Sequence, residues 1–280
     1  MTAWFPGPGW LFCPADRPDR YLKALALADV VILDLEDAVA PKRREAARKE
    51  LRRLASDGQL DPERTLVRVN GSGPGSVADH NADLKVIEAL GLPRVMLAKA
   101  EDPASVRAID REVVVLLETP KGVEFARELA EQDNVIGVMW GADDLIAGLG
   151  GTSSRFPNGK LRDAARYARS RALVAAKAYH RLALDAVHMD IPDLDGLSAA
   201  CHDAAATGFD TTVAIHPSQI ATVRAAYAPS EELVSWARRL LDHVGDDRGV
   251  TTFEGRMVDG PIYKQAERIL RLAPMVKGSR

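Results

Sequence analysis

Short apolar runs alternate with longer amphipathic segments along most of the chain. The apolar runs span Trp10–Cys13, Val30–Leu35, Thr65–Asn70, Val95–Ala98, Val113–Leu117, Val135–Trp140, Leu184–His188 and Thr211–Ile215. Between them, residues 42–55, 78–90, 123–131, 163–181 and 197–207 carry apolar side chains at three- and four-residue spacing, the period of an α-helix. The runs are apolar throughout rather than alternating, which is typical of strands in a sheet covered on both faces.

Eight units of strand followed by helix, in about 230 residues, are what a closed (β/α)8 barrel, the TIM barrel, requires. The sequence therefore predicts the α/β class with this architecture. A doubly wound open sheet is the structural alternative, but no G-x-G-x-x-G follows the first run, so a dinucleotide site has no support. The segment 148–160 is rich in Gly, Ser, Pro and Asn, and we expect it to be a mobile loop between a strand and a helix.

The tail after Val244 breaks this rhythm. It reads as a glycine-rich loop followed by one more helix, which predicts a C-terminal helical extension appended to the barrel. We therefore expect a TIM-barrel domain over residues 1–245 and an extension over residues 246–280.

Composition removes several classes of function. The formal net charge of −3 provides no basic field for a nucleic-acid partner. No apolar stretch reaches the roughly 18 residues that a membrane-spanning helix needs, and the N-terminus does not resemble a signal peptide, so we expect a cytoplasmic protein. The two cysteines, Cys13 and Cys201, lie far apart and lack metal-type spacing, so each is interpreted as a small buried hydrophobic residue.

Polar residues stand where the predicted strands end, and the active site of such a barrel lies at the carboxyl ends of its strands. These residues are Asp34, Glu36, Asp37, Arg68, Asn70, Lys99, Glu118, Asp143, Asp144, Asp190 and His216. Structural roles compete for several of them. Asp37 and Asp143 could cap the helices that follow, Lys99 could form an ion pair across the barrel mouth, and His216 could orient a loop.

The joint pattern points to a divalent metal. Four or more carboxylates in one concave mouth repel each other unless cations offset their charge. Mg²⁺, or Mn²⁺ in its place, prefers oxygen ligands, and Glu118 and Asp144 at neighbouring strand ends are suited to hold it. Arg68 could then bind a substrate carboxylate with its planar fork. A Schiff base on Lys99 is the chemical rival, disfavoured because anionic neighbours raise the pKa of a lysine.

Several segments of the sequence closely resemble those of one protein family. These are LFCPADRPDRYLKAL, VVILDLEDAVAPKRREAAR, RVN, LAKAED, LLETPKG, MWGADDLIAGLG, AIHPSQI and FEGRMVDGPIYKQAERIL, which run in order over nearly the whole chain. They resemble the citrate lyase β-subunit-like family, which includes malyl-CoA, β-methylmalyl-CoA and citramalyl-CoA lyases and stands beside the metal-dependent pyruvate aldolases.

The resemblance implies roles for individual residues. It implies a TIM barrel that binds Mg²⁺ through Glu118 and Asp144, with Arg68 beside the metal on the carboxylate of a 2-oxo acid. Glu36 and Asp37 match the acidic pair of that family near the site, as catalytic positions that orient water and Arg68.

Two further residues follow from the resemblance alone. Lys23 matches a lysine that meets the phosphates of coenzyme A. Asp259 in the tail matches a residue that reaches a neighbouring subunit's active site and acts there as acid or base. The extension would then be a lid supplied to a partner, and the enzyme a homo-oligomer, a trimer or a hexamer.

The reaction implied is the cleavage of a 3-hydroxyacyl-CoA to an acyl-CoA and a 2-oxo acid, or the reverse condensation. Three alternatives remain open: a pyruvate-type aldolase acting on free hydroxy-keto acids, a citrate lyase β subunit that needs an acyl-carrier partner, and a barrel that serves only as a binding module. The sequence leaves the acyl group and the oxo acid undetermined, because they differ by a methyl group or a carboxylate.

Overall fold

In a computed structural model of the chain, residues 4–246 and 248–277 are described, and the first of two compact units ends at Val223. This unit contains one parallel sheet of eight strands in sequential order. The strands are β1 (Trp10–Pro14), β2 (Val30–Asp34), β3 (Thr65–Val69), β4 (Arg94–Leu97), β5 (Glu112–Leu117), β6 (Val135–Trp140), β7 (Leu182–Asp185) and β8 (Thr211–Thr212).

Hydrogen bonds just after β8 join the last strand to the first. The Phe12 N–H donates to the Ala214 carbonyl at 2.9 Å, and the Ala214 N–H donates to the Trp10 carbonyl at 2.9 Å. These bonds bring the eighth strand region back to the first, so the predicted (β/α)8 barrel is confirmed.

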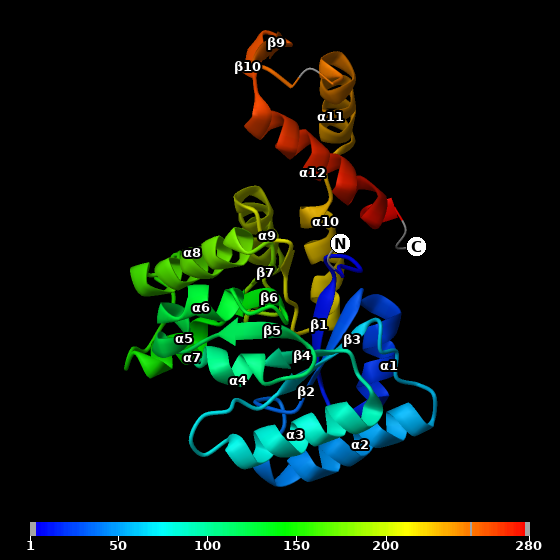
Figure 1. The fold of residues 1–280 in the computed structure, drawn as a ribbon, viewed down its shortest axis with the longest axis vertical. Helices are drawn as coiled ribbons and strands as arrows, with labels where there is room; N and C mark the ends of the chain where they lie inside the picture. Colours follow the sequence, from blue (N-terminus) through cyan, green and yellow to red (C-terminus); the bar gives the residue numbers. More distant parts are fainter. Residues whose placement is uncertain (1–3, 247, 278–280) are drawn as a thin grey trace. The chain divides into compact units, whose positions relative to one another are not determined.

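Helices follow the strands around the outside of the barrel. They are α1 (Pro18–Leu27), α2 (Arg44–Ser56), α3 (Val77–Leu90), α4 (Pro103–Arg107), α5 (Pro120–Glu124), α6 (Ala126–Ala130), α7 (Ala142–Gly148), α8 (Asp163–Ala178), α9 (Leu194–Thr207) and α10 (Ile220–Tyr227), with 3-10 turns η1 (Pro41–Arg43) and η2 (Pro217–Gln219). Figure 1 shows α2 and α3 side by side on one flank of the strands and α8 on another.

Large apolar side chains fill the inside of the barrel. Trp10, Ile32, Leu66, Met96 and Leu184 are among the fully or almost fully buried members of this core. Since the helices cover the outer face, both faces of the strands are buried, which explains why the runs carry apolar residues at every position. Polar groups on the strands are thereby confined to their ends.

Several predicted elements differ in extent from the observed ones; the strand expected over 211–215, for example, is β8 with only Thr211–Thr212. The expected strand 184–188 is observed as β7, which stops at Asp185 because the Asp185 carboxylate takes the next backbone N–H, that of Ala186, at 3.0 Å. The expected helix 123–131 is split into α5 and α6 at Phe125, whose backbone leaves the helical conformation.

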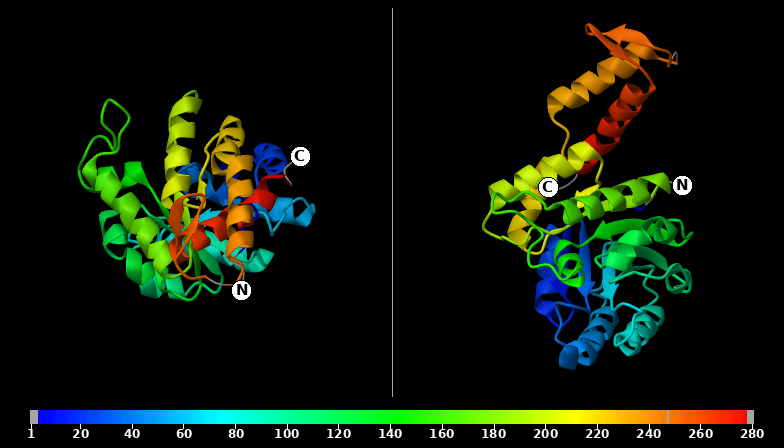
Figure 2. Two further views of the ribbon diagram at one scale, coloured as in Figure 1. Left: turned by 90° about the horizontal axis from the view of Figure 1, so that it is seen from above. Right: turned by 90° about the vertical axis from the view of Figure 1, so that its left-hand side faces the viewer.

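The second unit starts at Arg224, within α10. It contains α11 (Glu231–Val244), an antiparallel hairpin of β9 (Thr251–Phe253) and β10 (Arg256–Val258), and α12 (Gly260–Lys277). In Figure 2 the hairpin connects the end of α11 to the start of α12. Leu240, Val258 and Tyr263 belong to the hydrophobic core of the second unit. The Tyr263 hydroxyl donates to the Gly249 carbonyl at 2.6 Å. The final helix was predicted, and the hairpin was not.

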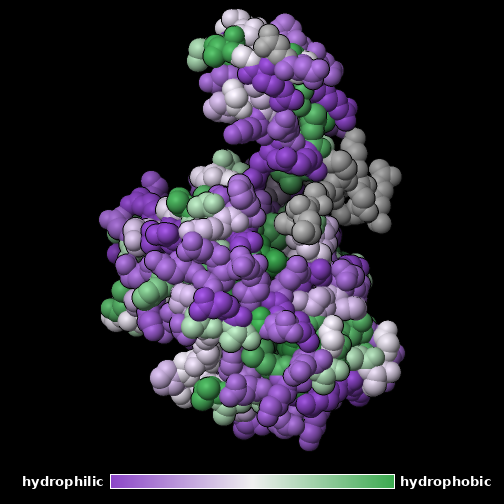
Figure 3. Space-filling view, in the orientation of Figure 1, coloured by the Kyte–Doolittle hydropathy of each residue, from purple (hydrophilic) through white to green (hydrophobic). Residues whose placement is uncertain are grey.

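The outer surface of the first unit is mostly hydrophilic on the face that Figure 3 shows. None of the helices described here is both long enough and apolar enough to pass through a bilayer.

Candidate active site

Arg68 and Asp34 form the floor of the candidate site at the ends of β3 and β2. The two residues are paired in register on neighbouring parallel strands, so their side chains point the same way. The Arg68 guanidinium donates to both Asp34 oxygens, through Nε at 2.7 Å and Nη2 at 2.6 Å. Asp34 is only 1% exposed, and its negative charge outweighs the effect of burial and raises the pKa of Arg68. The pair fixes the plane of the guanidinium.

Asp34 also organises the turn that follows β2. Its two oxygens accept the backbone N–H groups of Glu36 and Ala38, each at 2.9 Å. The turn therefore presents the Glu36 carboxylate to Arg68, with 3.5 Å between Arg68 Nη1 and Glu36 Oε2. Burial raises the pKa of Glu36, against the opposing charge of Arg68.

Lys99, just after β4, closes the acidic turn from the other side. Its ammonium donates to Glu36 and lies 3.3 Å from Asp37 Oδ2 and 3.9 Å from Asp144 Oδ1. Burial opposes the ammonium charge, but Glu118 and the Glu36 hydrogen bond outweigh it and raise the pKa of Lys99. For Asp37, burial is likewise outweighed, here by a side-chain hydrogen bond with Glu36 and by the charge of Lys99, and its pKa is lowered.

Glu118 at the end of β5 is the most enclosed acid of the site, with 2% of its surface exposed. Its Oε1 accepts the Lys99 backbone N–H at 2.9 Å. Gly141 makes room for it, because a Cβ on Gly141 would lie 2.7 Å from the Glu118 Cβ and 3.1 Å from its Oε2. Burial raises the pKa of Glu118 to about 8, although Arg68 and Lys99 pull it down. A carboxyl of this kind ionises at neutral pH only if another cation comes close.

Asp144 supplies the second candidate metal ligand, from the first turn of α7. Its side chain is 45% exposed, and its Oδ1 lies 3.9 Å from the ammonium of Lys99, the residue whose backbone N–H donates to Glu118. The carboxylate cluster, defined as Asp34, Glu36, Asp37, Glu118 and Asp144, faces two cations, Arg68 and Lys99, so its acids outnumber the cations beside them.

These residues fit a hard divalent cation. Within the part of the chain that the structure describes, no three His, Cys, Asp or Glu side chains converge as a ready-made metal site. Mg²⁺ does not require such a cage, because it usually takes one or two carboxylates and completes its coordination with water and substrate oxygens. Buried Glu118 next to exposed Asp144 offers that combination of a fixed ligand and an open side.

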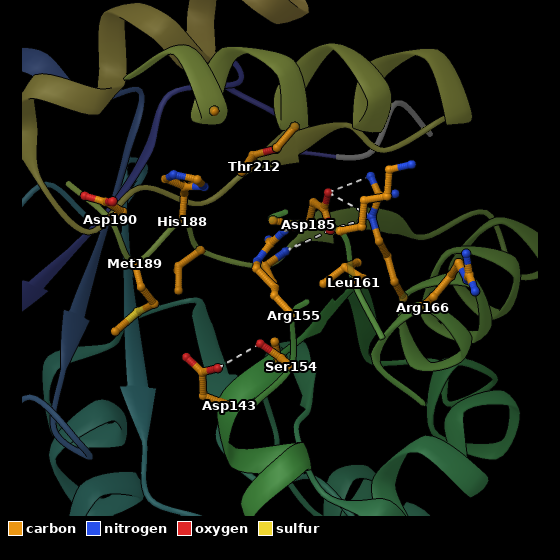
Figure 4. Close-up of a pocket in the computed structure, with 18 of the residues that line it drawn as sticks. Asp143, Ser154, Arg155, Leu161, Arg166, Asp185, His188, Met189, Asp190 and Thr212 are labelled. Carbon is orange, nitrogen blue, oxygen red and sulfur yellow. Dashed lines mark hydrogen bonds and ion pairs between the residues drawn. The ribbon is translucent and has the colours of Figure 1, made fainter. Parts of the chain in front are cut away.

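A pocket of about 900 Å³ lies where β6, β7 and β8 end, and no member of the carboxylate cluster lines it. Figure 4 shows Asp143, Ser154 and Arg155 on one side of it and His188 and Asp190 on another. The Ser154 hydroxyl donates to Asp143 Oδ1 at 3.2 Å, which ties the loop 149–162 to α7. The loop that we expected to be mobile thus forms one wall of a cavity that Asp143 also lines.

Other predicted residues lie elsewhere or have structural roles. Lys23 is exposed on α1, and no hydrogen bond or ion pair of the described residues joins it to the cluster. Asp259 lies in the second unit, between β10 and α12. His216 caps the turn η2 by accepting the Ser218 N–H at 3.2 Å, which confirms its loop-orienting role. Lys99 is confirmed as an ion-pair partner. Asp37 does not cap η1, whose N-cap is Ala40.

Comparison with known proteins identifies the family. The profile of the HpcH/HpaI aldolase/citrate lyase family matches residues 10–217, well over half of the chain. The chain therefore belongs to the HpcH/HpaI aldolase/citrate lyase family. The predicted membership and the predicted enzyme class, a carbon–carbon lyase, are confirmed at this level.

Individual relatives agree with this assignment. A citrate lyase subunit beta-like protein of Mycobacterium tuberculosis is 54% identical over 268 residues, 95% of this chain and 96% of the relative. The mitochondrial citramalyl-CoA lyase of Rattus norvegicus is 31% identical, over 95% of this chain and 86% of that protein. The crystal structure of protein CitE from Mycobacterium tuberculosis, in complex with magnesium, acetoacetate and coenzyme A, has a TM-score of 0.88 and 53% identity, covering 98% of this chain and 99% of that one.

Proposed function

We propose that this member of the HpcH/HpaI aldolase/citrate lyase family is a Mg²⁺-dependent lyase that cleaves a 3-hydroxyacyl-CoA to an acyl-CoA and a 2-oxo acid, or catalyses the reverse condensation. The observation that carries the proposal is the buried carboxyl of Glu118, which lies beside Asp144 and near Arg68 in a cluster with excess negative charge. The relatives support the thioester substrate, since citramalyl-CoA lyase is named for one and protein CitE is complexed with magnesium and coenzyme A.

Glu118 and Asp144 would hold the Mg²⁺ ion, and Mn²⁺ would be accepted in its place. When bound, the metal supplies Lewis-acid polarisation of substrate oxygens and a counter-charge for Glu118. Glu118 also contributes to substrate binding by fixing that charge next to Arg68. The backbone N–H of Lys99 keeps the Glu118 carboxylate aimed at the mouth of the barrel.

Arg68 would bind the carboxylate of the oxo-acid portion. Asp34 occupies Nε and Nη2, so Nη1 is the edge left for a substrate, with Glu36 3.5 Å away as its nearest acid. Glu36 and Asp37 belong to the catalytic group because they line the same mouth and are held in place by Lys99. Their carboxylates would orient a water molecule and Arg68.

The cleavage requires a base and an acid. The base removes the proton of the 3-hydroxyl, the bond between the second and third carbons of the acyl chain breaks, and its electron pair moves to the thioester as an enolate. The former hydroxyl carbon becomes the carbonyl of the released oxo acid. Asp259 would protonate the enolate carbon to give the acyl-CoA, and the reverse reaction uses the same groups.

The remaining elements of the proposal concern assembly. Residues 1–245 would form the catalytic domain and residues 246–280 a lid whose Asp259 completes the site of a neighbouring subunit in a homotrimer or hexamer. Lys23 on α1 would meet the coenzyme A phosphates. Neither nucleic acid nor membrane has a part in this proposal, and the cytoplasm remains the predicted location.

A panel of 3-hydroxyacyl-CoA thioesters tests the proposal. Malyl-, citramalyl- and citryl-CoA are incubated with the purified full-length chain and Mg²⁺, and the products are identified by mass spectrometry. We expect one thioester to yield an acyl-CoA and an oxo acid, and chelation of the metal to stop the reaction. Cleavage of free hydroxy-keto acids, with no thioester cleaved and no thermal shift on adding coenzyme A, would instead establish the pyruvate-type aldolase.

The name of the most similar relative cited above, a citrate lyase subunit beta-like protein, favours one second candidate: a subunit that acts on a carrier-bound substrate. The same assay separates the two functions when an acyl-carrier protein loaded with the acid is added. If turnover requires the carrier protein and no coenzyme A thioester is cleaved, the chain is a lyase subunit that acts on a carrier-bound substrate, and the proposed function is wrong.

A further inference from the structure

Lys99 touches most of the carboxylate cluster from its centre. Its side chain reaches Glu36, Asp37 and Asp144, at the distances given above, while its backbone N–H donates to Glu118. One residue therefore contacts both acids that we assign to the metal, each through a different part of itself.

The backbone of Lys99 is held in an unusual conformation to achieve this. Its φ of +50° lies in the left-handed region, which residues other than glycine seldom adopt. Hydrogen bonds on either side fix it, from the Ala98 N–H to the Val69 carbonyl at 3.2 Å and from the Ala100 N–H to the Leu116 carbonyl at 3.1 Å. This twist sends the N–H toward Glu118 and the side chain toward the turn after β2. Strained backbones of this kind persist where the surrounding structure enforces them, commonly at functional sites.

The two cations of the cluster differ in how firmly they are held. Arg68 is locked by two bonds to the buried carboxylate of Asp34 and stacks over the Phe12 ring, with 4.8 Å to the ring centroid. The Lys99 side chain is 34% exposed and has a flexible aliphatic stem. Of its three ammonium–carboxylate contacts, the one to Asp144 is the longest, at 3.9 Å. The ammonium can therefore withdraw from Asp144 while keeping its bond to Glu36.

We propose that the Lys99 ammonium is the resident counter-ion of Asp144, and that the ammonium and a divalent ion held by Asp144 and Glu118 are alternative partners of the Asp144 carboxylate. This inference rests on the proposed metal site. In the metal-free protein the ammonium limits the repulsion among the acids. When the ion binds, Lys99 releases Asp144 and keeps Glu36 and Asp37.

Competition of this kind has two linked consequences. Removing the ammonium leaves the carboxylates without their nearest mobile cation, which destabilises the metal-free protein. The same change removes a positive charge that the incoming ion must approach, so the ion binds more tightly and stabilises the protein by a larger amount. A lysine that merely held the site together would have the opposite effect on metal affinity.

The test compares Lys99→Met and Lys99→Arg with the wild type in the full-length protein. The matched control is Lys85→Met, which removes an exposed lysine from α3. Mn²⁺ binding is measured by calorimetry at low ionic strength, and thermal unfolding is followed with and without Mg²⁺. We expect Lys99→Met to tighten the Mn²⁺ Kd roughly tenfold on Coulombic grounds. It should also lower the metal-free Tm and enlarge the Tm increase caused by Mg²⁺.

Lys99→Arg, which keeps the charge, and Lys85→Met should each retain the wild-type Kd within about twofold. Unchanged or weaker Mn²⁺ binding in Lys99→Met would overturn the inference while leaving the metal site intact. Absence of Mn²⁺ binding and of any Mg²⁺-dependent Tm change in the wild type would instead remove the proposed metal site itself. If the methionine variant does not fold, Lys99→Gln, which retains a donor toward Glu36, gives the same comparison.

Discussion

Two acid–base clusters at the ends of barrel strands use the same residue types in different ways. Around Arg169 on α8, the guanidinium donates to Asp185 through Nε and Nη2 and to Asp203 through Nη1 at 2.7 Å. Asp185 in turn accepts the Trp140 indole N–H at 2.6 Å. Each carboxylate in this Arg169 cluster has a close donor, and the charges of Asp185 and Asp203 outweigh burial to raise the pKa of Arg169.

The carboxylate cluster around Arg68 is not balanced in this way. Arg68 is engaged by Asp34 much as Arg169 is by Asp185. Glu118, in contrast, is buried with a raised pKa, and among the described residues its hydrogen-bond donor is a backbone N–H, that of Lys99. A closed cluster stabilises the junction between α8 and β7. An acidic cluster with too few cations can instead bind a further one. This difference in charge balance distinguishes the carboxylate cluster, which we take to be functional, from the structural Arg169 cluster.

The largest expected effect tests which carboxylates receive the cation. Glu118→Gln and Asp144→Asn should each lower kcat/KM about 100- to 1,000-fold, because each removes a charge that stabilises the metal and the transition state. Asp143→Asn is the matched control, since Asp143 is adjacent in sequence but bonds Ser154. Its activity should stay within about threefold of the wild type, because surface changes of this kind cost little. Equal losses at 143 and 144, measured by steady-state kinetics, would contradict the assignment.

A smaller effect is expected when the two buried aspartates, Asp34 and Asp185, are substituted and compared. Asp34→Asn and Asp185→Asn each weaken a bidentate bond to an arginine, and each should lower stability by about 3 kcal/mol because a buried guanidinium loses its counter-charge. Only Asp34→Asn should also raise the KM for the substrate, about 10- to 100-fold, by releasing Arg68. Denaturant unfolding and steady-state kinetics on both variants measure these quantities. A matching KM increase in Asp185→Asn would erase the distinction between the clusters.

A third effect is the pH dependence of stability in the presence of a chelator. Burial raises the pKa of Glu118 from its usual 4.5 to about 8, so over this interval the folded protein binds a proton that the unfolded chain has released. The contribution of Glu118 is therefore full at low pH and is lost as the pH rises through about 8. The wild-type Tm should fall more than that of Glu118→Gln between about pH 5 and 8, at about 2–4 °C per kcal/mol for a domain of this size. Parallel curves would contradict the raised pKa.

The sequence was sufficient for the barrel because each strand is a continuous apolar run between helical segments. It also placed Arg68, Lys99, Glu118 and Asp144 at one end of the barrel, since residues that follow parallel strands share an edge. Element limits were less predictable. The end of β7 depends on the Asp185 side chain taking a backbone N–H, and the β9–β10 hairpin consists of two three-residue strands in a tail read as loop.

The roles of two residues of the site were not predicted. Asp34 was named among the polar residues at the strand ends but was given no role, yet it holds Arg68 and the turn to Glu36. The signal was present in the alignment of strands, because Asp34 and Arg68 are register partners, but register is fixed by pairing in three dimensions rather than by the local pattern. Gly141 was missed for a similar reason, since its importance depends on how closely Glu118 approaches it from the neighbouring strand.

The fit between Gly141 and Glu118 has a use beyond this molecule. A methyl group at position 141 would lie within 2.7 Å of the Glu118 Cβ, so we expect an alanine there to displace the glutamate. In genome surveys, a homologue that keeps every acidic residue of this site but carries alanine at the position of Gly141 should be sorted with the inactive barrels. The residue at position 141, which has no functional side chain, would thus indicate whether Glu118 can take its place in the site.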